Sequence, residues 1–159
     1  MPGAHCFLRG APVSVYDRDV RYSLEVLASD VDCGLAQEIW EAALAACEVP
    51  AKPVWFHGDV ADGNLLVRDG RLSAVIDFGC SGVGDAACDM YIAWTMFRDA
   101  ERRRFKAVLG IDASSWARGR GWVLWKALIR LALRDEEAPD WLAVLDQVFG
   151  EYRTPKVTS

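Results

Sequence analysis

The chain has 159 residues, of which 52% are hydrophobic, and this length and composition suit one folded domain with its own core. A formal net charge of −5 leaves no basic excess, which argues against a nucleic acid as partner. No stretch reaches about 18 uninterrupted apolar residues, and the first ten residues lack the apolar core of a signal peptide. We therefore expect a cytoplasmic protein that does not bind a membrane. The five cysteines form no Cys-x-x-Cys pair, so we expect reduced thiols.

The first half of the chain predicts an irregular lead followed by two helices. Glycines and a proline disfavour a helix over residues 1–16. The first helix begins with Asp17 as its cap and runs to about Ala28. The second spans roughly Gly34–Cys47 and ends before Pro50.

Strands are predicted in the middle of the chain. Val54–Phe56 suits a short buried strand. Asn64–Val67 and Leu72–Ile76 are two further strands, and Asp69-Gly70 between them is a strong signal for a two-residue hairpin turn.

The rest of the chain is predicted to be helical after a glycine-rich turn. The expected helices lie at about Asp85–Phe97, Ala100–Leu109, Ser114–Leu133 and Pro139–Tyr152. We therefore expect a mainly α protein with a small antiparallel β hairpin, an α+β arrangement in a single domain over residues 1–159. Its catalytic and metal-binding segment would be residues 55–89, and residues 85–152 would form its helical part.

Three polar residues flank the hairpin in the order and spacing of a phosphoryl-transfer site. Asp59 follows His57-Gly58, Asn64 stands five residues later, and Asp77 opens the triplet Asp-Phe-Gly. Phosphoryl transfer needs a carboxylate that orients a hydroxyl and hard oxygen ligands that hold Mg²⁺. Because the hairpin turns back between Asn64 and Asp77, we expect both side chains to meet Asp59 in one cleft. The alternative is that these residues only form turns.

These motifs resemble a known family. The segments HGDVADGN (57–64), VIDFG (75–79) and GVGDAACDM (82–90) resemble the aminoglycoside phosphotransferase and choline kinase-like family, relatives of the protein kinases. Gly58 stands between His57 and Asp59 where protein kinases have Arg, and in this the sequence resembles the small-molecule branch of the family. The resemblance extends from about residue 3 to residue 152. It implies the carboxy-terminal catalytic lobe of the protein-kinase-like fold.

The resemblance also implies roles for the site residues. Asp59 would be the catalytic base, and Asn64 and Asp77 would hold Mg²⁺ and thereby ATP or GTP. Upstream of His57 the sequence contains no glycine-rich loop and no strand that carries a lysine. We therefore expect the amino-terminal lobe to be absent, nucleotide affinity to be low and the isolated chain to be inactive.

Three further residues are expected to support this site. His57 is interpreted as a structural hydrogen-bonding residue that supports the Asp-Phe-Gly segment, rather than as a catalytic acid. Asp85 opens a predicted helix and is expected to cap it. Asp89 either braces the catalytic loop, as the resemblance suggests, or is a solvated helix residue.

An acidic cluster provides a candidate substrate site. Asp135, Glu136, Glu137 and Asp140 fall between the last two predicted helices, where the family places its substrate-binding acids. They would suit a small, hydroxylated and polycationic acceptor, although a charged run between helices is also typical of a solvated loop.

The function that the resemblance implies is Mg²⁺-dependent transfer of a nucleotide γ-phosphate to a hydroxyl of a small, aminoglycoside-like molecule, an activity of antibiotic resistance. One alternative is a truncated, non-catalytic homologue. Another is a half-site completed in trans, either by a separate amino-terminal lobe or within a homodimer.

Overall fold

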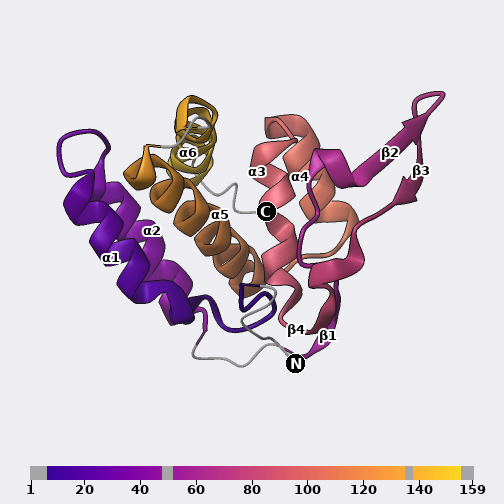
Figure 1. Cartoon of the computed structure of the whole chain (residues 1–159), viewed down its shortest axis with the longest axis horizontal. Helices are drawn as coiled ribbons and strands as arrows, with labels where there is room; N and C mark the ends of the chain where they lie inside the picture. The colour runs from indigo at the N-terminus through magenta and orange to yellow at the C-terminus, as the bar shows by residue number, and fades with distance from the viewer. Residues whose placement is uncertain (1–6, 48–51, 135–137, 155–159) are drawn as a thin grey trace.

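The computed structural model describes residues 7–47, 52–134 and 138–154, and these ranges are mainly helical, as the sequence predicts (Figure 1). The α-helices are α1 (Asp17–Val26), α2 (Cys33–Ala45), α3 (Ile92–Thr95), α4 (Asp99–Val108), α5 (Ala113–Leu133) and α6 (Ala138–Arg153). The strands are β1 (Val54–Phe56), β2 (Leu65–Arg68), β3 (Arg71–Val75) and β4 (Gly82–Gly84). Short 3₁₀ helices are η2 (Val13–Tyr16), η3 (Asp62–Asn64), η4 (Phe78–Cys80) and η5 (Ala86–Tyr91). No helix in these ranges is both long and apolar enough to span a bilayer.

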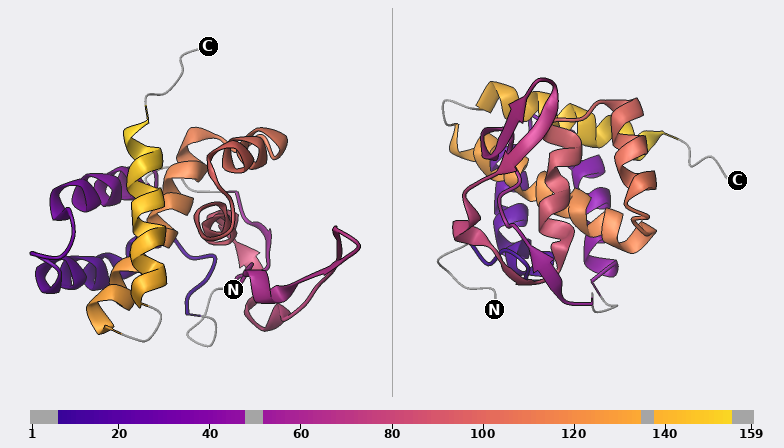
Figure 2. Two further views of the ribbon diagram at one scale, coloured as in Figure 1. Left: turned by 90° about the horizontal axis from the view of Figure 1, so that it is seen from above. Right: turned by 90° about the vertical axis from the view of Figure 1, so that its right-hand side faces the viewer.

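Helix α5 is the centre of the helical body. It packs against α1, α2, α6 and η5, and Figure 2 shows it between these elements from two further directions. Its two glycines are points of close approach. A Cβ atom at Gly119 would lie 2.7 Å from the Cβ of Met90, and one at Gly121 would lie 2.6 Å from the Cβ of Ala43. Glycine lowers helix propensity, but here it lets two neighbouring elements contact the helix backbone.

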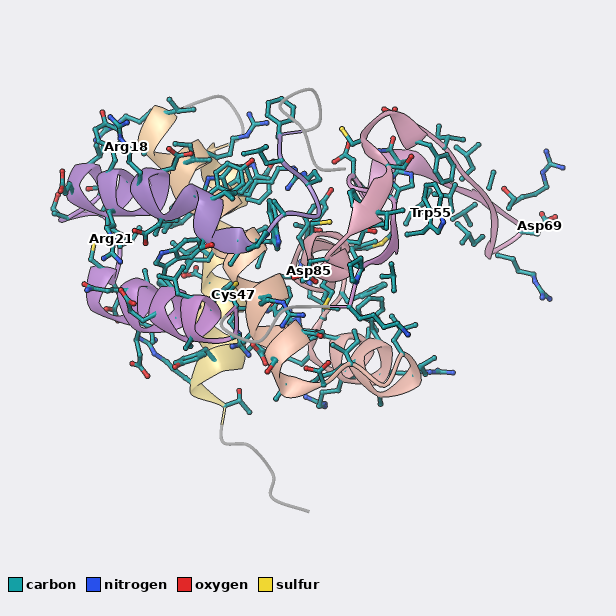
Figure 3. All side chains as sticks on the ribbon, turned by 90° about the horizontal axis from the view of Figure 1, so that it is seen from below. Arg18, Arg21, Cys47, Trp55, Asp69 and Asp85 are labelled. Carbon is teal, nitrogen blue, oxygen red and sulfur yellow. The ribbon has the colours of Figure 1, made fainter. Side chains whose placement is uncertain are left out.

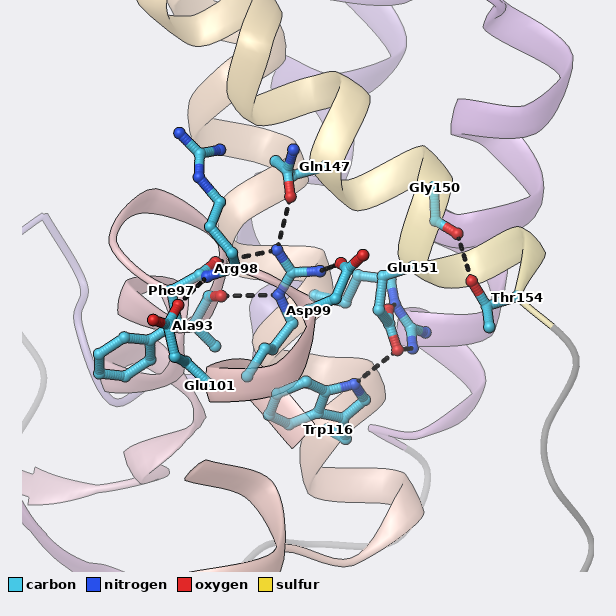
Figure 4. A network of polar contacts seen from close by, with 12 residues as sticks. Ala93, Phe97, Arg98, Asp99, Glu101, Trp116, Gln147, Gly150, Glu151 and Thr154 are labelled. Carbon is cyan, nitrogen blue, oxygen red and sulfur yellow. Dashed lines mark hydrogen bonds and ion pairs between the residues drawn. The ribbon is translucent and has the colours of Figure 1, made fainter. Parts of the chain in front are cut away.

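A polar network joins α3, α4, α5 and α6 (Figure 4). Glu151 on α6 accepts hydrogen bonds from Arg120 Nε at 2.7 Å and from Trp116 Nε1 at 3.0 Å, both on α5. The buried guanidinium of Arg102 on α4 donates to the Ala93 carbonyl at 2.7 Å and to Gln147 Oε1 at 2.9 Å. These buried cations are therefore paired with acceptors from α3 and α6.

The strands form two separate antiparallel pairs. β2 and β3 form the predicted hairpin, with Leu65 opposite Val75. Its turn residues, Asp69 and Gly70, both have positive φ, which a two-residue type I′ turn requires. Strand β1 pairs with β4, a contact that local sequence patterns did not predict. The β2–β3 hairpin projects away from the helices, with Asp69 at its tip (Figure 3).

The structure differs from the sequence predictions at strand β1, at Asp17 and at the helix expected over Asp85–Phe97. Strand β1 is not buried as a whole, because Val54 is 45% and Trp55 78% exposed while only Phe56 is enclosed. Asp17 is the first residue of α1 rather than its cap, since its carboxylate accepts hydrogen bonds from Arg21 and from Trp40. The helix expected at Asp85–Phe97 is a 3₁₀ segment followed by the single short helix α3.

Candidate active site

The loop that carries Asp59 is fixed by Asp89 of η5. The two oxygens of Asp89 accept hydrogen bonds from the backbone N–H groups of His57 and Gly58, each at 2.7 Å. Burial raises the pKa of the Asp89 carboxyl above its ordinary value, and the hydrogen bonds from these two amides offset only part of that rise. Asp89 thus contacts the catalytic loop directly and is not a solvated helix residue.

Gly58 could not be another residue in this loop. Its φ is +85°, and a Cβ atom there would lie 2.3 Å from the carbonyl oxygen of Cys80. Both facts favour glycine, because other residues are strained at this φ and the clash is with backbone that cannot rotate away.

His57 joins the catalytic loop to the Asp-Phe-Gly segment. Its Nδ1 accepts a hydrogen bond from the Asp59 N–H at 3.2 Å, so Nε2 carries the proton and donates to the Ile76 carbonyl at 2.9 Å. The ring centroid lies 4.6 Å from that of Phe78. With both nitrogens in hydrogen bonds and the ring buried, the side chain holds two loops together and has no free nitrogen for proton transfer.

The carboxylate of Asp59 is held from two sides. Asn64 Nδ2 donates to the Asp59 backbone carbonyl at 2.9 Å and to Oδ2 at 3.3 Å. The Tyr91 hydroxyl donates to Oδ1 at 3.3 Å. Burial, and next the charge of Asp59, raise the pKa of Tyr91, so its hydroxyl stays a donor. Sequence reasoning missed Tyr91, although it directly follows the segment 82–90 that carries the family resemblance.

A backbone hydrogen bond at the base of the hairpin links the segment of Asn64 to that of Asp77. The Ile76 N–H donates to the Asn64 carbonyl at 3.0 Å, and Asp77 is the next residue. Asn64 ends η3 just before β2, so it does not begin the strand as predicted, and Asp77 lies two residues beyond the end of β3. Asp77 is exposed and has a φ of +61°. The structure therefore brings Asn64 into contact with Asp59 and places Asp77 beside the same end of the hairpin.

The donor groups at this end fit Mg²⁺. Because Asn64 directs its Nδ2 at Asp59, its side-chain oxygen faces elsewhere and has no hydrogen-bond donor among the described residues. An amide oxygen and the exposed Asp77 carboxylate are hard ligands of the kind that Mg²⁺ uses together with phosphate oxygens. In the part of the chain that the structure describes, no group of three or more His, Cys, Asp or Glu side chains is placed to hold a metal ion.

Asp85 is a structural residue at the start of η5. Its carboxylate caps this segment by accepting from the Ala87 N–H at 3.0 Å, and it forms an ion pair with Arg118 of α5 at 2.6 Å. Both groups of the pair are largely buried, so Asp85 fixes η5, and with it Asp89, against α5.

Two hollows adjoin the loop. One, of about 400 Å³, has Asp59 in its wall together with residues of α5 and of the Phe7–Arg9 segment. The other, of about 480 Å³, is lined by Asp62 and by Asp140 at the start of α6. The remaining predicted substrate acids, Asp135, Glu136 and Glu137, lie outside the described residues.

The sequence matches the phosphotransferase enzyme family over residues 9–122. It is also 32% identical to an aminoglycoside 3′-phosphotransferase of Escherichia coli over 79 residues, which amount to 48% of this chain and 29% of that enzyme. The matched stretch thus spans less than a third of this relative. No solved structure matches the chain significantly. Because the family match extends over most of the chain, including residues 57–64 and the hairpin, the chain belongs to the phosphotransferase enzyme family.

Proposed function

We propose that this chain carries the catalytic loop and the metal ligands of a phosphotransferase that moves the γ-phosphate of ATP or GTP to a hydroxyl group of a small molecule. The observation that carries the proposal is the Asp59 carboxylate, which is fixed by Asn64 and Tyr91 in the wall of an open hollow. Family membership supports phosphoryl transfer as the class of reaction.

Asp59 would orient the acceptor hydroxyl and take its proton. The hydroxyl oxygen forms a new bond to the γ-phosphorus, the bond from that phosphorus to the bridging oxygen breaks, and the nucleoside diphosphate leaves. Asp59 is half-buried and each of its oxygens already accepts one hydrogen bond. A carboxylate oxygen can accept a further donor, so the acceptor hydroxyl finds a carboxylate whose position is set in advance.

Asn64 Oδ1 and the Asp77 carboxylate are the residues that would hold Mg²⁺. A bound Mg²⁺ would neutralise charge on the phosphate oxygens of the nucleotide. Asp77 is exposed and is therefore accessible to a nucleotide from solvent.

Aminoglycosides are the first acceptors to test, because the relative is named for that substrate. The hollow between Asp62 and Asp140 supports a cationic acceptor, since two carboxylates line it and one of them belongs to the catalytic loop. Arg98 also lines this hollow, so its charge is mixed rather than wholly acidic.

A half-site completed in trans is the second candidate function. It is favoured by the exposure of large apolar side chains around the site, among them Trp55 at 78%, Val67 at 62% and Phe78 at 58%. Exposed apolar patches of more than a few hundred Å² mark interaction surfaces in soluble proteins.

Calorimetric titration with Mg–ATP and with Mg–GTP tests the proposal. We expect nucleotide binding that depends on Mg²⁺ and that Asp77→Ala abolishes, with Asp69→Asn as a matched control at the hairpin tip. Nucleotide binding that depends neither on Mg²⁺ nor on Asp77 would refute the assigned metal ligands. No binding even at millimolar nucleotide would instead favour a truncated, non-catalytic homologue.

A further inference from the structure

Three cationic side chains line the hollow beside Asp59, and positive charge there disfavours a polycationic acceptor. Arg9, Lys126 and Arg130 line it, and Asp59 is the one acidic side chain among its described lining residues. Arg9 comes from the segment before η2, and the two other cations come from α5. Residues far apart in the sequence therefore direct three cations to one hollow.

Arg9 is the most informative of the three. Only 6% of the residue is exposed, and its guanidinium lies 5.3 Å and 5.7 Å from the ring centroids of Trp122 and Trp125. Within the described ranges no carboxylate pairs with it and no acceptor takes a hydrogen bond from it. Asp89 lies near enough to sense its charge, but both oxygens of Asp89 accept from the His57 and Gly58 amides.

Such an arrangement leaves donors without acceptors. A buried guanidinium carries five N–H groups, and stacking on aromatic faces satisfies its charge only in part. Trp125 also lines the hollow, and its indole N–H is buried without an acceptor among the described residues. A ligand that completes this site must bring several acceptor atoms and negative charge, and phosphate or carboxylate oxygens do both.

The position of the hollow separates it from the proposed metal ligands. Asp59 lies in its wall, whereas Asn64, Asp77 and the strands of the hairpin do not. A ligand bound here therefore reaches Asp59 from the α5 side.

We propose that this hollow is an oxyanion-binding site in which the buried guanidinium of Arg9 holds a phosphate or carboxylate group beside Asp59. As a statement about the ligands of the Asp59 site, the inference rests on the proposed function. The group comes either from the acceptor, which would then be a hydroxylated compound with its own negative charge, or from the phosphate end of the nucleotide. A polycationic acceptor would have to bind in the hollow of Asp62 and Asp140 instead.

Titration of the whole chain with inorganic phosphate, at constant ionic strength against sodium chloride, tests the proposal without any turnover. We expect saturable phosphate binding by calorimetry, accompanied by a rise in Tm. Arg9→Gln should weaken phosphate binding at least about tenfold, because a charged hydrogen-bond donor is lost. Arg9→Lys keeps the charge and should weaken it less. Arg103→Gln, which removes an exposed arginine on α4, is the matched control and should change nothing.

Arg130→Gln keeps the test decisive if Arg9→Gln does not fold, since Arg130 lines the same hollow and is only half-buried. It should also weaken phosphate binding. Wild-type binding no stronger than that of chloride would overturn the proposal, and so would unchanged affinity in every folded Arg9 and Arg130 variant.

A competition experiment identifies the source of the anion. If Mg–ATP displaces phosphate, the hollow holds the phosphate end of the nucleotide. If Mg–ATP and phosphate bind together, the hollow holds an anionic group of the acceptor. Phosphate binding that persists without any nucleotide binding would support this inference while refuting the proposed function, so the two failures can be told apart.

Discussion

Asp89 is the residue through which the helical body positions the loop that carries Asp59, and replacing Asp89 should show this directly. Asp89→Ala removes the acceptor of two hydrogen bonds, each 2.7 Å long, from the N–H groups of His57 and Gly58. Both donor residues are buried, so water cannot easily replace the lost carboxylate.

The magnitude follows from these contacts. Hydrogen bonds to a charged group contribute about 1.5–3 kcal/mol each, which gives a gross loss of about 3–6 kcal/mol. Burial of the carboxylate opposes part of this, as the raised pKa of Asp89 indicates. We expect a net loss of about 2–3 kcal/mol in the free energy of unfolding, or about 5–10 °C in Tm for a domain of this size.

Asp89→Asn separates the hydrogen bonds from the charge. An amide keeps one acceptor oxygen, loses the second and no longer buries a charge, so its loss should be about 1 kcal/mol and smaller than that of alanine. Asp69→Asn is the matched control, because Asp69 is exposed at φ +51°, where Asn is equally suited. Urea unfolding followed by tryptophan fluorescence measures all three variants. An Asp89→Ala variant as stable as wild type would refute the view that this carboxylate fixes the loop.

Three other predictions concern catalysis, pH and association. In a form of the protein that transfers phosphate, either this chain or a complex that it completes, Asp59→Ala should lower turnover by about 10²–10⁴-fold while nucleotide affinity stays unchanged, whereas Asp77→Ala should weaken Mg–nucleotide binding as well. Calorimetry and single-turnover kinetics distinguish the two variants, and equal affinity losses would contradict the assigned roles. Burial pushes the pKa of Glu151 up, but the hydrogen bond and charge of Arg120 outweigh it and hold the pKa below the ordinary 4.5. The stability that the Glu151–Arg120 pair contributes should therefore be complete above about pH 4.5 and should be lost as the pH falls further. Glu151→Gln should lower the free energy of unfolding at pH 7 by about 2 kcal/mol, measured by urea unfolding, and this loss must become smaller in acid. Exposed Trp55 and the apolar hairpin should cause self-association in sedimentation velocity at micromolar protein, and a monodisperse monomer would count against this surface as an interface.

Local chemistry made the hairpin and the long helices predictable. Asp69-Gly70 specifies a turn with positive φ at both positions, and the structure has this turn between β2 and β3. Helix α5 was expected despite Gly119 and Gly121. Its hydrophobic periodicity predicted the helix better than the low helix propensity of glycine did, because close packing explains both glycines.

Long-range contacts explain what the sequence did not predict. The apolar run Val54–Phe56 reads as buried, but its pairing with β4 leaves the outer face of Trp55 open. Asp17 is of a residue type that often caps helices, yet its carboxylate accepts a hydrogen bond from the indole N–H of Trp40, which lies 23 residues further on. These contacts depend on where distant elements pack, and periodicity carries no such information.

The candidate site shows the same division. Asp59 and Asn64 were expected together, and the hydrogen bonds from Asn64 Nδ2 to Asp59 bring them together. Tyr91 and Arg9 were missed, since a tyrosine in a helical segment and an arginine in an irregular lead are unremarkable in sequence. Their meaning depends on burial beside Asp59, which only the fold provides.

The contacts of Asp59 also divide the site into a fixed and an adjustable half. Tyr91 belongs to η5, which Asp85 and Arg118 fasten to α5 in the buried body, whereas Asn64 lies at the base of the projecting hairpin. A partner that docks on the exposed hairpin and shifts it would therefore move Asn64 and the neighbouring Asp77 more than it moves the Asp59 carboxylate. Metal and nucleotide affinity should then respond to such a partner, while phosphate affinity at Arg9 should not, because Arg9 packs on Trp122 and Trp125 of α5.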